Sequence, residues 1–107
     1  MKATLHPDAE EDIAEAAAFY DRDGSPALAA RLVAEVKRVI NLVLANPGLG
    51  TPRRGGRKFF PTRVFPYAVI YRPTEDGIYV LVVCRHRRRP KFGVARKPRT
   101  PSTSGDA

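Results

Sequence analysis

Two stretches of helical periodicity dominate the first half of the chain. After Pro7, apolar residues recur at spacings of three and four as far as Tyr20, and the run from Asp21 to Gly24 interrupts the pattern. Ser25-Pro26 then supply a helix N-cap and a proline suited to the first turn of a second stripe, which ends at Asn46-Pro47-Gly48. The short break between the stripes predicts an antiparallel helical hairpin. The apolar positions are Ala9, Ile13, Ala16 or Ala17 and Tyr20 in the first stripe, and Leu28, Leu32, Val36, Val39, Ile40 and Val43 in the second.

The second half of the chain changes to the alternation of β-strands. Gly48 to Gly56 has the composition of a loop, and Asp76-Gly77 is a strong hairpin signal. The predicted strands are Lys58 to Val64 with an interruption at Pro61, Tyr67 to Arg72, and Ile78 to Arg85, preceded by a short strand at Lys2 to Leu5. Because both alternating sets of the last strand are apolar, we expect it in the middle of the sheet and covered on both faces.

These elements predict one α+β domain in the order β-α-α-β-β-β, with the helical hairpin packed on a small, mostly antiparallel sheet. A chain of 107 residues has room for one such domain. We place the domain at residues 1–97. Residues 98–107 lack core-forming side chains apart from the terminal alanine, so we expect a disordered tail there.

The composition argues against membrane and disulfide-stapled classes of protein. No apolar run approaches the roughly 18 residues that a membrane-spanning helix needs. The N-terminal segment turns acidic after Pro7 and shows no signal-peptide pattern. Cys84 is the only cysteine and cannot form an internal disulfide, which fits a reducing compartment. We therefore expect a cytoplasmic protein with no membrane partner.

Charge is divided unevenly along the chain. Residues 1–47 hold five Lys/Arg and eight Asp/Glu, a balance of −3, whereas residues 48–107 hold fourteen and three, a balance of +11, and together they give +8. One face or end of the fold should therefore be strongly positive and attract nucleic acid or an acidic protein. A basic surface that serves solubility alone would have the same composition.

Metal and nucleotide-cofactor chemistry finds little support in the sequence. His6, His86 and Cys84 show no spacing typical of a ligand pair. Gly55-Gly56-Arg57-Lys58 lacks the spacing and the Ser/Thr of a P-loop. No serine lies in a motif of a catalytic triad, and Cys84 ends a valine run where a buried, inert thiol is expected. We expect neither a metal nor a cofactor.

Two groups of basic residues are the candidates for a functional surface. Basic residues interleaved with aromatic ones are typical of a surface for single-stranded nucleic acid, with guanidinium on phosphate and ring on base. The alternative is that most of the rings pack in the core, because a small sheet needs them there. The groups are Arg85, His86, Arg87, Arg88, Arg89, Lys91 and Arg96 after the last strand, and Arg53, Arg54, Arg57, Lys58 and Arg63 before it, with Phe59, Phe60, Phe65, Tyr67 and Phe92 among them.

His86 is the residue with the most obvious capacity for chemistry. Strand alternation places Arg85 and His86 on opposite sides of the sheet. A neutral histidine could act as a general base, and an arginine could stabilise charge on phosphorus during cleavage of RNA through its 2′-hydroxyl. The structural alternative is a histidine that only makes hydrogen bonds at the end of a strand.

The order and spacing of several short motifs resemble the ParE/RelE superfamily of toxins from bacterial type II toxin–antitoxin systems, specifically its ParE-like, plasmid-stabilisation branch. The resemblance covers roughly residues 2–96, and Gly93 stands where this branch commonly has an aromatic residue. The motifs are an opening strand running into Pro7-x-Ala9, then Tyr20, Asn46-Pro47-x-x-Gly50, Arg63-x-Phe65-Pro66-Tyr67 leading into Ile70-Tyr71, and His86-x-x-Arg89-Pro90-x-Phe92-x-x-x-Arg96.

The resemblance implies a RelE/ParE-like fold and a toxin that inhibits growth unless a cognate antitoxin binds it through an acidic C-terminal segment. ParE-like members poison DNA gyrase by binding, whereas RelE-like members cut messenger RNA on the ribosome with clustered basic, tyrosine, histidine or glutamate groups. The Phe65-Pro66-Tyr67 and His86-to-Arg96 patterns favour the gyrase interpretation. The density of arginine leaves the ribosome-dependent endonuclease as an alternative, and a non-toxic, antitoxin-binding relic as another.

Two sets of candidate residues follow from the resemblance and the charge pattern. The target-binding set is Arg63, Arg85, His86, Arg89, Phe92 and Arg96, of which His86, Arg63 and Arg85 would be catalytic only in a ribonuclease. We expect the antitoxin to dock on the apolar helical hairpin and a sheet edge, with basic side chains pairing with its acidic ones. The antitoxin-binding set is Ile13, Tyr20, Leu32, Val36, Arg54 and Arg57.

Overall fold

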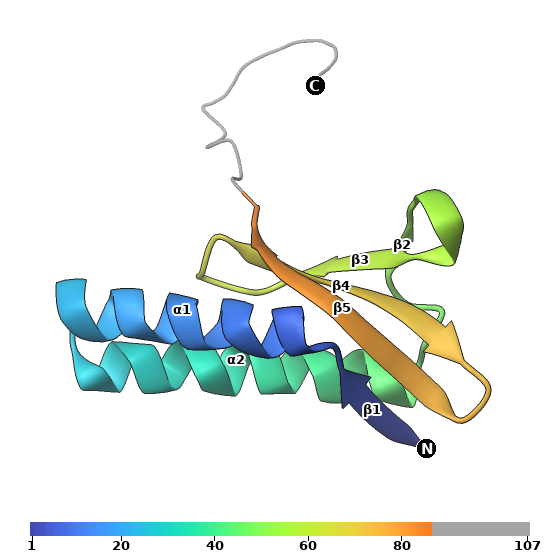
Figure 1. The fold of residues 1–107 in the computed structure, drawn as a ribbon, viewed down its shortest axis with the longest axis horizontal. Coiled ribbons are helices and arrows are strands. Elements are labelled where there is room, and N and C mark those ends of the chain that lie inside the picture. The colour runs from blue at the N-terminus through green and yellow to red at the C-terminus, as the bar shows by residue number, and fades with distance from the viewer. Residues whose placement is uncertain (87–107) are drawn as a thin grey trace, which may run out of the picture.

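The computed structural model describes residues 1–86, so the predicted tail at 98–107 and the end of the predicted domain lie outside the described residues. The helices lie side by side along one face of a five-stranded sheet, which gives two layers (Figure 1). This is the α+β arrangement that the sequence predicts. In chain order the elements are β1 (Lys2–Leu5), α1 (Pro7–Asp23), α2 (Pro26–Ala45), β2 (Thr51–Pro52), a 3-10 turn (Arg54–Gly56), β3 (Lys58–Pro61), β4 (Tyr67–Thr74) and β5 (Gly77–Arg85).

The strands follow the order β1-β5-β4-β3-β2 across the sheet. β1 is parallel to β5 and the other neighbours are antiparallel, so the sheet is mostly antiparallel as predicted. β1 accompanies β5 only as far as Val80, because the chain then turns into α1. Beyond that point α1 flanks the edge of β5, and the Asp12 carboxylate accepts the backbone N–H of Val83 at 3.0 Å.

Side-chain caps begin both helices. The Nδ1 of His6 accepts the N–H of Asp8 at 3.0 Å, and the hydroxyl of Ser25 accepts the N–H of Leu28 at 3.1 Å. Pro7 and Pro26 occupy the first helical position, where a missing N–H costs nothing. The predicted break at Asp21 is wrong, because α1 continues to Asp23 with polar residues on its exposed side. Neither helix is long and apolar enough to cross a membrane, nor is any other within residues 1–86.

The core lies between the helical hairpin and one face of β4 and β5. The apolar stripe of α2 is buried as its periodicity predicts, except that Leu28 at its start is only half-buried. The side chains that meet in this layer include Leu32, Val36, Val39 and Val43 from α2, and Tyr67, Val69, Tyr71, Ile78, Val80 and Val83 from the sheet.

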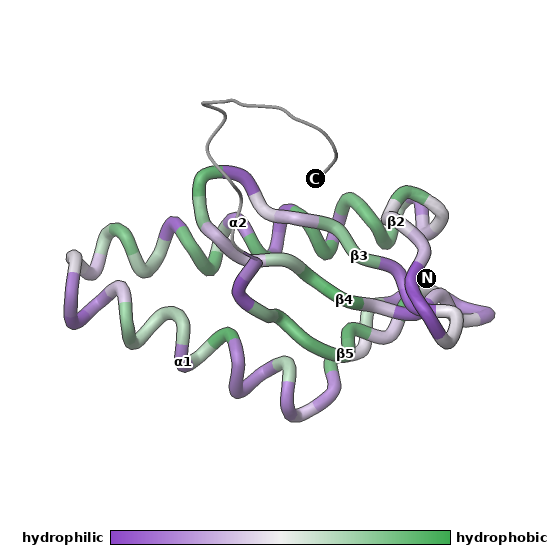
Figure 2. Tube along the Cα trace, turned by 90° about the horizontal axis from the view of Figure 1, so that it is seen from above, coloured by the Kyte–Doolittle hydropathy of each residue, from purple (hydrophilic) through white to green (hydrophobic). Residues whose placement is uncertain are grey.

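The other face of the sheet corrects one prediction. No element of residues 1–86 covers this open face, so the expectation that both faces of β5 are covered is wrong for the described part of the chain. Tyr79, Val82 and Cys84 of β5 are only half-buried there. Seen from above, apolar residues occupy the middle of β4 and β5 (Figure 2). Their neighbours within the sheet shield them only partly.

Two further differences concern the segments around β3. The predicted loop at 48–56 contains β2, whose Thr51 pairs with Phe59 and adds an edge strand to the sheet. A two-residue strand that includes a proline leaves no periodic signal. β3 itself ends at Pro61 rather than Val64, and residues 62–66 form a tight loop before β4.

Tyr71 ties the end of the helical layer to the sheet. Its side chain is fully buried, and its hydroxyl accepts the N–H of Gly50 at 2.9 Å and donates to the carbonyl of Pro47 at 2.8 Å. A Cβ at Gly50 would lie 2.8 Å from this hydroxyl, so the close approach requires glycine. The segment after α2 is therefore fixed to β4 by one phenol group.

Replacing Tyr71 by phenylalanine should lower the free energy of unfolding by about 1–3 kcal/mol, because two backbone groups lose their partner inside the protein. Urea unfolding measures this change. Tyr79→Phe is the matched control, since the Tyr79 hydroxyl makes no hydrogen bond within residues 1–86. Its effect should stay within about 0.5 kcal/mol. Equal losses in the two variants would show that the Tyr71 hydroxyl has no special role.

Candidate functional site

The β3–β4 loop and the end of β5 come together at one end of the sheet (Figure 1). Tyr67 pairs with Arg85 across β4 and β5, and the N–H of His86 donates to the carbonyl of Pro66 at 2.8 Å. This pairing brings Arg63, Arg85 and His86 to the same end of the molecule. We call this region the basic end of the sheet.

Arg85 and His86 nevertheless lie on opposite faces of the sheet, as the strand alternation predicts. The guanidinium of Arg85 lies 5.7 Å from the ring centroid of Tyr67, which belongs to the helix-facing core, and its Nη1 is 3.5 Å from the Tyr67 hydroxyl. The ring of His86 instead packs edge-on against Phe59, with 4.7 Å between the centroids. The two side chains therefore belong to different surfaces.

An open-face cluster forms around Phe59 and consists of Arg53, Phe59, Cys84 and His86. The guanidinium of Arg53 lies over the ring of Phe59, 4.2 Å from its centroid. The same ring is in edge contact with the imidazole of His86. Burial and the charge of Asp12 raise the pKa of the Cys84 thiol, against a weaker opposing effect of Arg53. The thiol is thus a poor nucleophile, which fits its interpretation as an inert cysteine.

The open-face cluster is a juxtaposition that sequence reasoning missed. Arg53, Phe59 and His86 were all candidates, but their contact depends on the register of three strands. Phe59 pairs with Ile70, which pairs with Val82, so Phe59 and the end of β5 share the open face. The cluster offers a cation and a planar ring side by side, which is a suitable surface for a phosphate or a nucleotide base.

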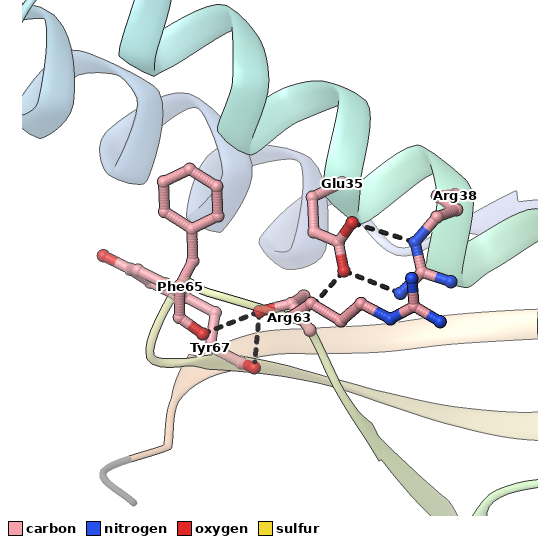
Figure 3. A network of polar contacts seen from close by, with 6 residues as sticks. Glu35, Arg38, Arg63, Phe65 and Tyr67 are labelled. Carbon is pink, nitrogen blue, oxygen red and sulfur yellow. Dashed lines mark hydrogen bonds and ion pairs between the residues drawn. The ribbon is translucent and has the colours of Figure 1, made fainter.

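Arg63 lies apart from this cluster, beside α2. Its backbone N–H donates to the Glu35 carboxylate at 2.7 Å, and the same carboxylate accepts from Nε and Nη2 of Arg38 at 2.9 and 2.7 Å (Figure 3). The hydrogen bond from Arg38, followed by the one from Arg63, holds the pKa of Glu35 below its ordinary value despite partial burial. The only sequence signal for this network is the three-residue spacing of Glu35 and Arg38 on a helix.

The three residues proposed for ribonuclease catalysis therefore diverge. Arg63 lies beside α2, Arg85 over Tyr67 and His86 against Phe59. The remaining target-binding candidates, Arg89, Phe92 and Arg96, lie outside the described residues. Within residues 1–86, no group of three or more His, Cys, Asp or Glu side chains could hold a metal ion.

The predicted antitoxin-binding residues do not form one surface. Leu32 is fully buried in the core and has no exposed surface for a partner, so the structure contradicts its place in the set. The reason is that one apolar stripe cannot face both the sheet and a partner. Ile13 and Val36 line an apolar groove with a volume of about 280 Å³, although Val36 is only 1% exposed, and contact of either residue with an antitoxin stays a prediction. The other lining residues are Leu5, Val33, Lys37, Ile40 and Asn41.

The other three residues of that set lie elsewhere. Tyr20 is half-buried and its ring packs edge-on against Phe65, 5.3 Å between centroids, so it joins α1 to the β3–β4 loop. Burial is the main cause that raises the pKa of the Tyr20 hydroxyl. Arg54 and Arg57 are exposed on and after the 3-10 turn. A partner that contacts all of them would have to wrap around the molecule.

Comparison with known proteins gives two similarities. A family model described as "ParE toxin of type II toxin-antitoxin system, parDE" matches residues 3–90. The fold is similar to a solved structure titled "Chromosomal ParDE TA system from P. aeruginosa", with a TM-score of 0.72 and 19% sequence identity over 81% of this chain and 97% of the other. At that identity the structural likeness concerns the fold. No curated protein matches the chain.

Changing Glu35 to glutamine should lower the free energy of unfolding by about 1–3 kcal/mol near neutral pH, because Arg38 and the Arg63 N–H lose a charged acceptor. The lowered pKa means that this stabilisation is present above the ordinary value of 4.5 and is lost as the pH falls below it. The difference in the free energy of unfolding between the native protein and the variant should therefore become smaller as the pH falls below this value. Urea unfolding over a pH series measures it.

Glu75→Gln provides the control for this pH series, because Glu75 is exposed in the turn between β4 and β5 and has no partner within residues 1–86. Its unfolding free energy should follow that of the native protein at every pH. If the loss of unfolding free energy in Glu35→Gln were the same at every pH, the charge of the Glu35 carboxylate would not be its cause.

Proposed function

Because the chain belongs to the ParE family of toxins of type II toxin–antitoxin systems, we propose that it arrests growth by binding and poisoning DNA gyrase, and that a cognate antitoxin neutralises it. Such a toxin acts in the cytoplasm, where gyrase is. The proposal assigns target binding to the basic end of the sheet. Arg89, Phe92 and Arg96 would extend this surface beyond the described residues.

The divergence of Arg63, Arg85 and His86 is the observation that favours binding over chemistry. General acid–base catalysis needs its groups within hydrogen-bond reach of one substrate. Arg85 and His86 lie on opposite faces of the sheet, because Arg85 contacts the ring of Tyr67 on the helix-facing side and His86 contacts the ring of Phe59 on the open face. A large target can contact both faces around one end of the sheet, whereas a single scissile phosphate cannot.

The charge distribution supports the same proposal. Residues 48–107, which include the whole sheet except β1, carry a balance of +11. A field of this size steers the protein toward DNA or an acidic protein surface. Gyrase bound to its DNA substrate offers both.

Neutralisation by an antitoxin has its support in the apolar groove and the family. The groove beside Ile13 exposes apolar side chains from β1, α1 and α2, with Lys37 at its rim. An amphipathic segment could bury apolar residues there and pair an acidic one with Lys37. The similar solved structure is titled as a ParDE toxin–antitoxin system, which fits a partner of this kind.

The ribosome-dependent endonuclease remains the second candidate, because the open-face cluster suits RNA. Phe59 and Arg53 could hold a base and a phosphate, with the imidazole of His86 4.7 Å from the ring of Phe59. A third candidate is a relic that binds an antitoxin but harms no cell. Each candidate predicts a different consequence of expression.

The test is to induce the chain in bacteria without an antitoxin and to pulse-label DNA and protein synthesis together. Early failure of DNA synthesis in filamentous cells that still translate supports gyrase poisoning. Collapse of protein synthesis with DNA synthesis intact would establish the endonuclease instead, and normal growth at high expression would establish the relic. Co-expression of a neighbouring gene for a DNA-binding protein with an acidic C-terminus should restore growth.

Charge reversal at the basic end should separate binding from catalysis in an assay of gyrase supercoiling. Arg53→Glu combined with Arg85→Glu should raise the concentration needed for inhibition by about tenfold or more, because both faces lose their cation. Arg72→Glu, at the other end of β4, is the control for each of the two reversals made singly, and should change the inhibitory concentration little.

His86→Gln tests catalysis directly, because glutamine keeps a planar polar group but cannot carry a proton between groups. A binding toxin should keep most of its potency with this change. Loss of about a hundredfold or more, together with loss of RNA cleavage on ribosomes, would contradict the proposal and identify His86 as an acid–base group.

A further inference from the structure

The β3–β4 loop holds a residue in a strained conformation. Val64 is the only non-glycine residue within residues 1–86 with a positive φ, 71°, and the N–H of Phe65 donates to the carbonyl of Arg63 around it at 2.7 Å. This is the rare form of γ-turn, and a β-branched residue is especially unfavourable there. The Val64 side chain is 84% exposed, so it contributes nothing to the core. Strain without a gain in folding is typical of a functional position.

Contacts on both sides fix this loop. The buried Thr62 shares its single hydroxyl hydrogen between the carbonyls of Phe65 and Tyr67, at 2.9 and 3.0 Å, and the Glu35 carboxylate on α2 accepts the N–H of Arg63 (Figure 3). Phe65 points toward the helices and packs on Tyr20. The loop is therefore a rigid platform that presents Arg63 and Val64, and little conformational entropy would be lost when a partner binds.

A hollow of about 360 Å³ lies between this loop and α2. Arg31, Arg38 and Arg63 line it, together with one carboxylate, that of Glu35. Arg38 pairs with Glu35, and the charge of Arg63 also acts on this carboxylate, but the guanidiniums of Arg31 and Arg63 make no hydrogen bond or ion pair within residues 1–86. Two guanidiniums can thus form new hydrogen bonds beside an exposed apolar side chain.

We propose that this hollow and Val64 form a docking site for an acidic peptide segment of a partner protein. A carboxylate of the segment binds between Arg31 and Arg63, and an apolar side chain of the segment covers Val64. The site uses a different side of α2 from the apolar groove, because Arg31, Glu35 and Arg38 line the hollow whereas Val33, Lys37 and Ile40 line the groove. It rests on the proposed function only in that an antitoxin is the first partner that could supply such a segment.

A peptide fits these observations better than a nucleic acid does. Among residues 1–86, Phe65 is the only aromatic residue that lines the hollow, and it is 7% exposed and packed on Tyr20, so it cannot stack on a base. The hollow offers Arg31 and Arg63 to a single anion, whereas single-stranded nucleic acids need a longer basic track for successive phosphates. A carboxylate followed by an apolar residue matches the charge and the exposed valine.

The test uses the full chain labelled with 15N and follows its backbone amide signals during titration. One probe is a short capped peptide in which glutamate alternates with leucine, and the other is a short oligothymidine. The proposal expects the peptide to shift the signals of Arg31, Arg63 and Val64. Shifts of these residues with oligothymidine alone, or peptide shifts confined to other parts of the chain, would overturn it. Neither result depends on toxicity, so failure here leaves the proposed function standing.

Arg31→Glu combined with Arg63→Glu should weaken peptide binding by about tenfold or more, because two charge-assisted contacts are lost. The matched control carries the same charge change at exposed arginines elsewhere, Arg22→Glu combined with Arg72→Glu. Equal weakening by the two double variants would show non-specific attraction and overturn the proposal. The amide spectrum of each free variant reports whether it is folded.

Val64→Gly separates binding from stability. Glycine adopts a positive φ without strain, so the thermal midpoint should stay unchanged or rise, while peptide binding should weaken by about threefold to tenfold through loss of the apolar contact. Unchanged peptide affinity in this folded variant would remove Val64 from the site.

Discussion

Within residues 1–86, helices cover only one face of the sheet, and this constraint decides where the functional groups can lie. Tyr67, Val69 and Tyr71 bury their side chains in the core shared with the helical hairpin, so residues that alternate with them face away from the helices. In the described part of the chain, apolar side chains on the open face are shielded only by neighbours within the sheet. Phe59 is an example, because Arg53 and His86 contact its ring. The contacts of Arg53 and His86 with Phe59 reduce the exposure of its ring, and they also place basic side chains on the open face.

Local signals in the sequence were sufficient for most of the fold. Ser25-Pro26 marks the start of α2, the alternation of β5 separates Arg85 from His86, and the change of period identifies the two layers. Contacts between distant segments were not predictable in this way. Helical periodicity identifies an apolar stripe but not what covers it, which is why Leu32 was assigned to a partner although it meets the sheet.

The candidate site depended even more on long-range contacts. The hydrogen bond from Arg63 to Glu35 spans two elements, and neither residue carries a local signal for it. The positive φ of Val64 occurs in a loop between β3 and β4, and nothing in the local sequence predicts it, because a β-branched residue disfavours this conformation. Sequence reasoning therefore identified the basic residues that gather at one end of the sheet, but not which of them share a surface.

The parallel pairing of β1 with β5 joins the first and last described elements of the chain. Lys2 lies beside Gly77 so closely that a Cβ at this glycine would collide with the Lys2 backbone, and the register runs on to Leu5 opposite Val80. While the chain is being synthesised, β1 has no partner until residues 77–80 have left the ribosome. The complete sheet thus forms only after β5 has been synthesised, because this pairing has the largest sequence separation among the strand pairs of residues 1–86. A nascent chain, or one truncated before β5, lacks the assembled basic end, so this surface exists only once residues 77–86 have been made.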